Sequence, residues 1–468
     1  MLFTYVFFIV LFFAVLNSVC LHVICQDIPS SRHGQTSALV GNKLYFFGGY
    51  MPSGVFTDEV WYLNLSSSLN TETLLWYRDT RMLVVYFSGA SCVSTIDKFS
   101  VFLVGGETYN SNSMTYNFSA PVYEFNSKAS NWTTPIIIGF NSSFINRNTM
   151  QGVINNNSKI FIFGGYNSTN PNSKTVIYND MNILDITTMN WLTLTQSDDI
   201  PSCIAYTATL LSDGRIIYIG GIKYGPLSAQ NSAPSPPSPV RPGNTTFLTR
   251  DIQAPAPINI NNEGNIIAPI ISGLSYIDMN KILIFDTTTY AWSNKTIIGD
   301  SLIGRIGHSI VLTQNGNIIL YGGSIVNLTT SDTTSILSEL AVLNTISWTW
   351  SILNVSKTNA PPPLTYHSAT LYENYMIISF GQTSSLPFED SNKIYILNTL
   401  TYTWVIMSNF TSNLTTPTNQ TQTSLTSIVG ISVGIGLLIL IGVFSFIIFL
   451  LRKRRLPKPI PTPGSISK

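Results

Sequence analysis

The stretch Phe161-Ile-Phe-Gly164-Gly165, followed by Leu184-Asp185 and then by Trp191, decides the fold. A continuous apolar run predicts a strand whose two faces are both covered. The glycine pair that ends it permits positive φ angles and a close approach of another backbone. The Asp predicts a side-chain hydrogen bond to the following turn, and the Trp is large enough to fill the space between two packed sheets.

The same pattern recurs along the chain and predicts a repeat architecture. Apolar runs end at Gly48-Gly49, Gly105-Gly106, Gly164-Gly165, Gly220-Gly221 and Gly322-Gly323, and a degenerate sixth run ends at Gly381-Gln382. The second element is Asn64 with Trp76, Asn126 with Trp132, Asp185 with Trp191, Asp286 with Trp292, Asn344 with Trp350, and Asn398 with Trp404. All these glycines and Trp residues are predicted to be structural. The first pair is six residues longer than the others.

Each unit reads as four short strands joined by tight turns, such as Asp213-Gly214 between the first two strands of the fourth unit. A third element opens several units, as in Arg32-His33, Arg305-Ile-Gly-His308 and Tyr366-His367. The motifs resemble the kelch repeat over about residues 30–407. The resemblance implies an all-β fold, a six-bladed kelch β-propeller over residues 26–407, closed radially so that only short edges remain.

The fourth unit contains an insertion at about residues 223–275, whose Pro-rich part, 232–243, cannot join a sheet. Because strands alternate in direction, the loops between second and third strands lie on the same face as the links between blades. Long loops on a rigid scaffold tend to carry function. We therefore predict that 223–275 help to form a partner site.

The two ends of the chain predict a single-pass type I membrane glycoprotein. Residues 1–25 resemble a secretory signal peptide, with an uncleaved signal anchor as the alternative. Residues 428–451 carry no charge and are long enough for a transmembrane helix, and the basic residues at 452–455 stop transfer. Residues 408–427 are then a flexible stalk and 452–468 a cytoplasmic, basic, Pro-rich tail. This layout resembles single-pass kelch proteins of fungi.

Sequons for N-glycosylation are frequent outside the predicted tail, in agreement with this topology. They lie at Asn64, Asn117, Asn131, Asn141, Asn156, Asn167, Asn244, Asn294, Asn327, Asn354, Asn409, Asn413 and Asn419. In the predicted span, Gly430 and Gly434 have a spacing that allows two helices to approach, which leaves a weak homodimer open.

Composition excludes several classes of function. Charged residues make up 10% of the 468 residues, and 24 basic against 23 acidic side chains give no surplus for binding nucleic acid. Four cysteines do not make a disulfide scaffold. We predict that Cys92 and Cys203 do not pair, because one whole blade separates them. No nucleotide-binding or hydrolase motif is present in the sequence.

Two candidate sites were weighed. His308 and His367 occupy one repeat position, and the resemblance extends to galactose oxidase, which holds a metal on the propeller axis. The residues taken as equivalent elsewhere, Gln35, Ser91, Met150 and Tyr206, form no ligand set, so structural hydrogen bonding is the better interpretation. Arg32 and Arg305 could pair with neighbouring blades or with a ligand, and structural pairing is the better interpretation.

The sequence thus predicts a non-enzymatic binding module with no cofactor and no metal. Its expected location is the plasma membrane or the secretory pathway, with the propeller extracellular or lumenal. Its partner is an unidentified protein or glycan. The alternatives are an extracellular enzyme of the galactose-oxidase type and a structural wall or adhesion protein.

Overall fold

The structure is a computed structural model that describes residues 27–410, apart from 111–112, 114, 116–119, 168–175, 198, 225–272, 385–387 and 409. The chain divides into two compact units, Met1–Ser412 and Asn413–Lys468, and only the first contains described residues. The predicted signal peptide, transmembrane segment and tail lie outside the described residues. Within the described part, no helix is long and apolar enough to cross a membrane.

The described residues form an all-β fold with one short 3₁₀ turn, η1 (Ser142–Phe144), and no α-helix. Six antiparallel sheets of four or five strands, here called sheets 1 to 6, follow one another along the chain. Their strands are, in sheet 1, β1 (Thr36–Val40), β2 (Lys43–Phe47), β3 (Val60–Asn64) and β5 (Trp76–Arg78); in sheet 2, β7 (Ala90–Val93), β8 (Ser100–Val104), β10 (Val122–Asn126) and β11 (Asn131–Thr133); in sheet 3, β13 (Gly152–Ile154), β14 (Lys159–Phe163), β17 (Met181–Asp185) and β18 (Asn190–Leu194); in sheet 4, β20 (Thr207–Leu210), β21 (Arg215–Ile219), β24 (Lys281–Asp286) and β25 (Trp292–Thr296); in sheet 5, β27 (Ser309–Leu312), β28 (Asn317–Tyr321), β31 (Leu340–Asn344), β32 (Thr349–Ile352) and the short parallel β26 (Ile298–Gly299); in sheet 6, β34 (Ser368–Tyr372), β35 (Tyr375–Ser379), β37 (Ile394–Asn398) and β38 (Thr403–Val405).

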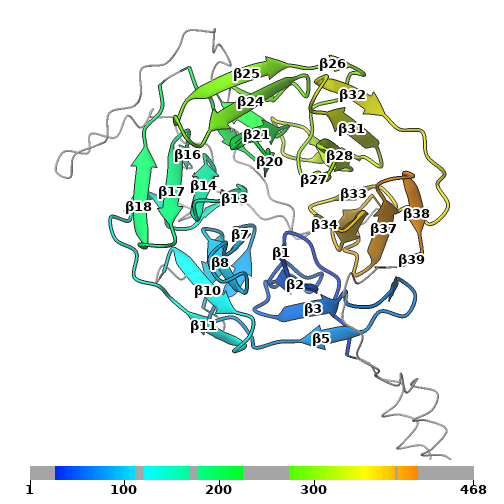
Figure 1. The fold of residues 1–468 in the computed structure, drawn as a ribbon, viewed down its shortest axis with the longest axis horizontal. Helices are drawn as coiled ribbons and strands as arrows, with labels where there is room; N and C mark the ends of the chain where they lie inside the picture. Colours follow the sequence, from blue (N-terminus) through cyan, green and yellow to red (C-terminus); the bar gives the residue numbers. More distant parts are fainter. Residues whose placement is uncertain are drawn as a thin grey trace, which may run out of the picture. The chain divides into compact units, whose positions relative to one another are not determined.

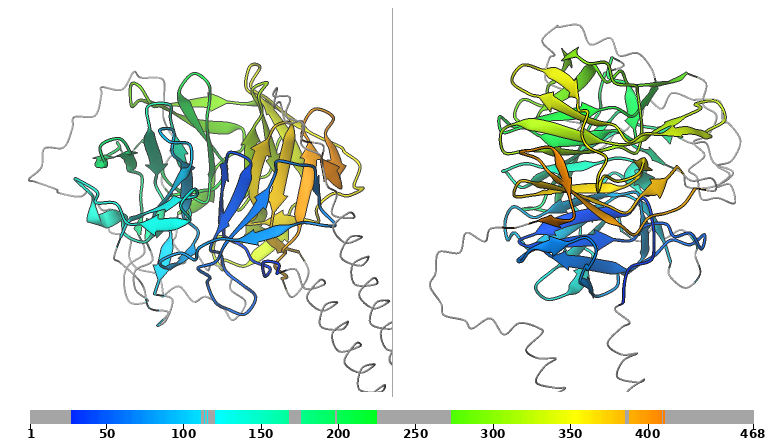
Figure 2. Two further views of the ribbon diagram at one scale, coloured as in Figure 1. Left: turned by 60° about the horizontal axis from the view of Figure 1, so that its bottom comes forward. Right: turned by 90° about the vertical axis from the view of Figure 1, so that its right-hand side faces the viewer.

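The first strand of each sheet contacts the first strand of the next, and β34 contacts β1, so the sheets close into a ring around an axis (Figure 1). Figure 2 turns this ring edge-on and shows that the strands run across its thickness. Apolar clusters fill the space between neighbouring sheets, as where Tyr45 and Phe47 of sheet 1 meet Val101 and Leu103 of sheet 2.

The repeated Asp or Asn shapes the turn between the third and fourth strands. In all six sheets its side-chain oxygen accepts a hydrogen bond from the backbone N–H two residues on, as for Asp286 and Thr288 (2.8 Å). The following Trp packs against the neighbouring sheet. The ring centroids of Trp132 and Phe47 are 5.8 Å apart, and those of Trp404 and Tyr321 are 5.4 Å apart. Trp76, Trp191, Trp350 and Trp404 are buried, whereas Trp132 and Trp292 are half-buried.

Short strands form a second layer of pairing at the mouth of the ring where the first strands begin. Most of them join the link that enters a sheet to the loop between its second and third strands. They are β6 (Val85–Phe87) with β9 (Glu107–Tyr109); β12 (Arg147–Asn148) with β15 (Tyr166–Asn167) and β16 (Val176–Ile177); β19 (Ser202–Ile204) with β22 (Ile222–Tyr224) and β23 (Leu274–Tyr276); β29 (Ser324–Val326) with β30 (Thr333–Ile336); and β33 (Leu364–Thr365) with β36 (Gln382–Thr383).

The ring closes between sheets 6 and 1 without sharing a strand. The long loop before Trp76 holds β4 (Leu69–Asn70), which pairs with β39 (Met407–Ser408). This pairing gives the six additional residues of the first repeat a structural role. Phe410 packs 4.8 Å from Tyr372, so the folded part continues past residue 407, the predicted end of the propeller. On the mouth side, Nδ1 of His33 lies 2.8 Å from Oδ1 of Asp390, and both side chains are buried.

Candidate functional site at the channel mouth

A ring of six backbone positions surrounds the mouth of the central channel. Each position precedes the first strand of its sheet and has a φ between +52° and +64°. The six residues are Gly34, Ser88, Thr149, Ala205, Gly307 and Tyr366. Only glycine adopts this left-handed conformation at little cost, so the four other residues hold it under strain. We call this set the mouth ring.

Backbone hydrogen bonds join the mouth ring from sheet to sheet. In each of five bonds the backbone N–H of one mouth-ring residue donates to the carbonyl oxygen of the mouth-ring residue in the preceding sheet, with N···O distances of 2.8 to 3.1 Å. The donor and acceptor pairs are Tyr366 and Gly307, Gly34 and Tyr366, Ser88 and Gly34, Thr149 and Ser88, and Ala205 and Thr149. The sixth bond, from the N–H of Gly307 to the carbonyl of Ala205, is absent from the backbone hydrogen bonds of the described residues. Among the described residues the mouth ring is therefore an open chain, in which the N–H of Gly307 and the carbonyl of Ala205 have no backbone partner.

The glycine pairs form a complete ring one layer further out. The N–H of the second glycine in every pair donates a hydrogen bond to a carbonyl oxygen of the link that enters the next sheet. The accepting residue stands two positions before the mouth-ring residue of that sheet, as for Gly165 N–H and the carbonyl of Cys203 (2.9 Å). A Cβ on Gly221 would lie 2.5 Å from the carbonyl oxygen of Ile204, which explains the need for glycine there.

In sheet 6 the prediction was wrong by one residue. Phe380 occupies the first-glycine position with a φ of +61°, and Gly381 is the second, donating to the carbonyl of Arg32 (3.0 Å). The pair is thus Phe380-Gly381 and not Gly381-Gln382. Phe380 is fully buried, and its ring centroid lies 5.1 Å from that of Phe46 and 5.7 Å from that of Trp76. Its ring therefore fills the seam between sheets 6 and 1.

A buried arginine at each of sheets 1, 3 and 5 pairs with a carboxylate and with the carbonyl of the first glycine of the pair. Arg32 donates to Oε2 of Glu59 (2.7 Å) and to the carbonyl of Gly48 (3.2 Å) within its own sheet. Arg305 makes the matching contacts with Glu339 and Gly322. The expected structural pairing is confirmed for both, although it lies within the sheet. Burial lowers the pKa of each guanidinium, and the paired carboxylate opposes that effect.

Arg147 makes the same contacts in sheet 3, with Asp180 and the carbonyl of Gly164. The sequence analysis missed it because no His follows Arg147 at the spacing found in sheet 5. The equivalent of His308 in sheet 2 is Gly89, next to Ser88 of the mouth ring, so the assignment of Ser91 to that position was wrong.

The two histidines are buried against the neighbouring sheet. Nε2 of His308 lies 2.9 Å from Oγ1 of Thr207, and Nε2 of His367 lies 2.7 Å from Oγ of Ser309. Burial lowers the pKa of each imidazole to about 3. Their Nδ1 atoms have no hydrogen-bond partner. The described residues contain no group of three His, Cys, Asp or Glu side chains placed to hold a metal.

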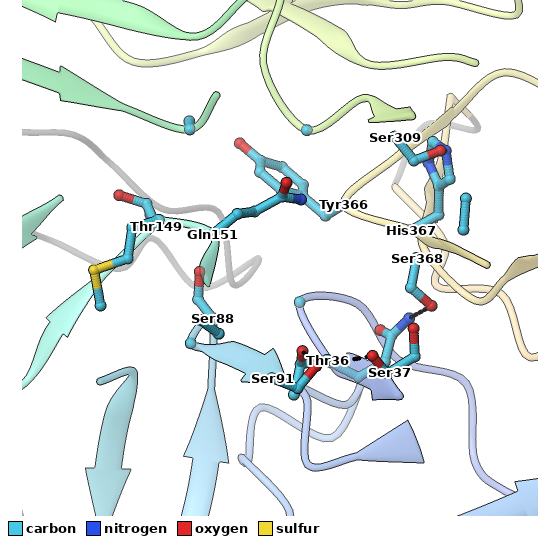
Figure 3. A pocket seen from close by; sticks show the side chains of 18 of the residues that line it. Thr36, Ser37, Ser88, Ser91, Thr149, Gln151, Ser309, Tyr366, His367 and Ser368 are labelled. Atoms are coloured by element: carbon cyan, nitrogen blue, oxygen red, sulfur yellow. Dashed lines mark hydrogen bonds between the residues drawn. The ribbon is translucent and has the colours of Figure 1, made fainter. Parts of the chain in front are cut away.

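A pocket of about 260 Å³ opens at the mouth ring and is lined by the first strands of the sheets (Figure 3). Among the described residues, its lining holds Ser, Thr, Gln, Tyr and two neutral His side chains but no Asp, Glu, Lys or Arg. Several hydroxyls are already paired in the wall, as between Thr36 and Ser91 (2.8 Å). The side chains of Gln151 and Tyr366 reach furthest toward its centre (Figure 3).

Gln151 is anchored at one end only. Its Oε1 accepts a hydrogen bond from the N–H of Ala208 (2.7 Å), and its Nε2 has no partner among the described residues. Tyr366 is itself a mouth-ring residue, and burial raises the pKa of its hydroxyl. Neither residue was singled out from the sequence as a site residue, since an isolated Gln or Tyr gives no sequence signal.

The insertion begins beside the break in the mouth ring. Its flanks β22 and β23 pair with each other, and β22 pairs with β19, which directly precedes Ala205. The hydroxyl of Tyr276 on β23 donates to the carbonyl of Val326 on β29, in the loop between the second and third strands of sheet 5 (2.8 Å). The predicted insertion therefore starts and ends at the seam between sheets 4 and 5, and residues 225–272 lie outside the described residues.

None of the remaining predicted residues lines the pocket, and several lie outside the described part. Cys92 on β7 and Cys203 on β19 are buried and free, so the prediction that they do not pair is confirmed. The exposed sequon residues are Asn64, Asn131, Asn156, Asn327 and Asn354, and those half-buried are Asn141, Asn167 and Asn294. The others, Asn117, Asn244, Asn409, Asn413 and Asn419, lie outside the described residues with Gly430 and Gly434.

This geometry is that of a repeat protein of the kelch class. Residues 10–221 and 270–436 match the family model described as the KLHDC2/KLHL20/DRC7 Kelch-repeats domain, and the chain belongs to that family. The match omits 222–269, which is most of the insertion.

Two relatives are similar to this chain. It is 23% identical over 222 residues to "Kelch domain-containing protein 1" of Homo sapiens, covering 43% of this chain and 52% of that protein. It is 23% identical over 375 residues to "Kelch domain-containing protein 3" of Bos taurus, covering 76% of this chain and 79% of that protein. The chain thus spans about half of the human relative and most of the bovine one.

Proposed function

We propose that this kelch-repeat protein is a six-bladed propeller that acts as a non-enzymatic binding module, displayed by a single type I membrane segment outside the cell or in the lumen of the secretory pathway. The mouth ring is the binding face. The observation that carries the proposal is the convergence, at one seam of that face, of an unpaired backbone donor and acceptor, an uncharged pocket and the root of the insertion.

Binding fits this site better than catalysis. The two imidazoles at the pocket wall are buried and neutral, with their Nε2 atoms engaged by hydroxyls of the neighbouring sheet. A general base must reach the proton that it abstracts, and these side chains are held in the wall. The residues that do reach into the pocket are Gln151 and Tyr366. The amide of Gln151 can orient a ligand by hydrogen bonding, and the ring of Tyr366, whose hydroxyl interacts with Ser324, can do so by contact.

The experiment is partner capture on intact cells that express the full chain. Proximity labelling from the predicted extracellular end should identify a protein or glycoprotein partner. Deletion of 230–249 removes no described strand, so the protein should still fold and reach the surface with reduced capture. Unchanged capture would place the partner site elsewhere and leave the insertion as a spacer. If the deletion abolishes surface display, partner capture by Gln151→Ser and Tyr366→Gly tests the binding face instead.

A further inference from the structure

The break in the mouth ring has the features of a subsite for a hydroxyl group. At the five intact positions the N–H of one sheet meets the carbonyl of the one before it. At the sixth, Gly307 and Ala205 both line the pocket, and among the described residues the N–H of Gly307 and the carbonyl of Ala205 have no backbone partner. One hydroxyl can accept a hydrogen bond from the first and donate one to the second, because it is donor and acceptor at once.

Side chains on both sides of the break extend this subsite. Gln151 belongs to sheet 3 and Tyr366 to sheet 6, so they flank the seam between sheets 4 and 5 from either side. The free Nε2 of Gln151 is a second hydrogen-bond donor directed at the pocket. The ring of Tyr366 is partly exposed at the pocket, and its hydroxyl interacts with Ser324. The ring can therefore offer an apolar face, which suits the C–H groups of a ligand.

The charge of the pocket limits the ligand. Its described lining carries no ionised side chain, and the two imidazoles in the wall are neutral. A carboxylate, phosphate or ammonium group would lose its hydration there without gaining an opposite charge. A ligand with several hydroxyls and no charge exchanges hydrogen bonds with water for hydrogen bonds with the wall at little cost.

We propose that the channel mouth binds a neutral carbohydrate, with one sugar hydroxyl bridging Gly307 and Ala205, the amide of Gln151 donating to a second, and the ring of Tyr366 against the sugar face. This inference rests on the proposed binding function and names its ligand class. The pocket volume of about 260 Å³ sets the scale at one or two sugar residues of a longer chain.

The test uses the purified full chain and an array of neutral oligosaccharides, with sialylated and sulfated oligosaccharides and free-carboxylate peptides on the same array. Gln151→Ser and Tyr366→Gly introduce residues that other sheets already hold at the same positions, Ser309 and Gly307. The fold should therefore tolerate both. Gln314→Ser, in an exposed turn between β27 and β28 outside the pocket lining, is the matched control.

We expect the wild type and Gln314→Ser to bind at least one neutral sugar with equal affinity. Gln151→Ser and Tyr366→Gly should each weaken it at least tenfold, while each variant still unfolds in one cooperative transition. Binding of only anionic glycans or peptides overturns the ligand class, as does neutral-sugar binding that both variants retain. If the two variants abolish partner capture on cells while no neutral sugar binds, the binding function stands and the carbohydrate proposal falls.

Discussion

Phe380 offers a sharp test of how the glycine pairs work, because it holds a left-handed conformation that the first residue of the other five pairs holds as glycine. Replacement by glycine removes a backbone strain of about 1–2 kcal/mol, and the greater freedom of glycine in the unfolded chain costs about 0.5–1 kcal/mol. Losing a fully buried phenylalanine ring costs about 3–5 kcal/mol. The packing loss is the larger effect, so Phe380→Gly should destabilise the protein by about 2–4 kcal/mol.

The comparison with Phe380→Ala isolates the backbone contribution. Alanine loses the same ring contacts with Phe46 and Trp76 but keeps the strain, so it should be less stable than glycine by about 0.5–1 kcal/mol. This order reverses the usual preference for alanine over glycine. Urea unfolding of the full chain, followed by tryptophan fluorescence, measures both differences. If Phe380→Ala proves more stable than Phe380→Gly, the residue is not held in the left-handed region and our explanation of the pair is wrong.

Four further predictions follow from the same structure. Trp350→Ala should cost about 3–5 kcal/mol in unfolding experiments and Trp132→Ala less, because Trp132 is half-buried; equal losses would contradict the burial argument. Cys92 and Cys203, whose thiol pKa burial raises to about 12, should react with a thiol reagent only after unfolding, and labelling of the native protein would refute this. The native pKa of about 3 for His308 and His367 lies below the ordinary 6.5, so the unfolded chain binds more protons at low pH. Stability should therefore fall as pH drops from about 6.5 toward 3, and His308→Gln should flatten the fall in melting temperature. An epitope tag after residue 468 should be inaccessible on intact cells and a tag at Asp27 accessible; the reverse pattern would overturn the type I topology.

The repeated motif predicted the strands and their contacts well, because each of its residues performs a local task. The Asp or Asn accepts a hydrogen bond within its own turn, the Trp packs against the preceding sheet, and the second glycine leaves space for a neighbouring backbone. The one-residue error in the predicted glycine pair of sheet 6 arose because a residue other than glycine holds the first position of that pair. Phe380 adopts the positive φ angle under strain, so the sequence shows a single glycine, Gly381, and the motif assigns it to the first position of the pair instead of the second.

The mouth ring could not be predicted in this way. Its six positions hold five different residue types, and what they share is a backbone angle and at least one backbone hydrogen bond to a neighbouring sheet. No side-chain pattern encodes either property. Gln151 and Tyr366 become site residues only because closure of the ring brings sheets 3 and 6 to opposite sides of one seam.

The position of the break in that ring supports a functional origin. Closure is most demanding between sheets 6 and 1, where the two ends of the folded region meet. That seam nevertheless has its mouth-ring hydrogen bond from Gly34 to Tyr366, the glycine contact to Arg32, the pair of His33 with Asp390 and the strand pair β4–β39. Between sheets 4 and 5 the chain is continuous and the glycine contact from Gly221 to Arg305 is intact. Only the innermost hydrogen bond is missing, at the seam where the insertion begins and ends. Difficulty of closure therefore does not explain the break, which is the position that the proposed ligand would fill.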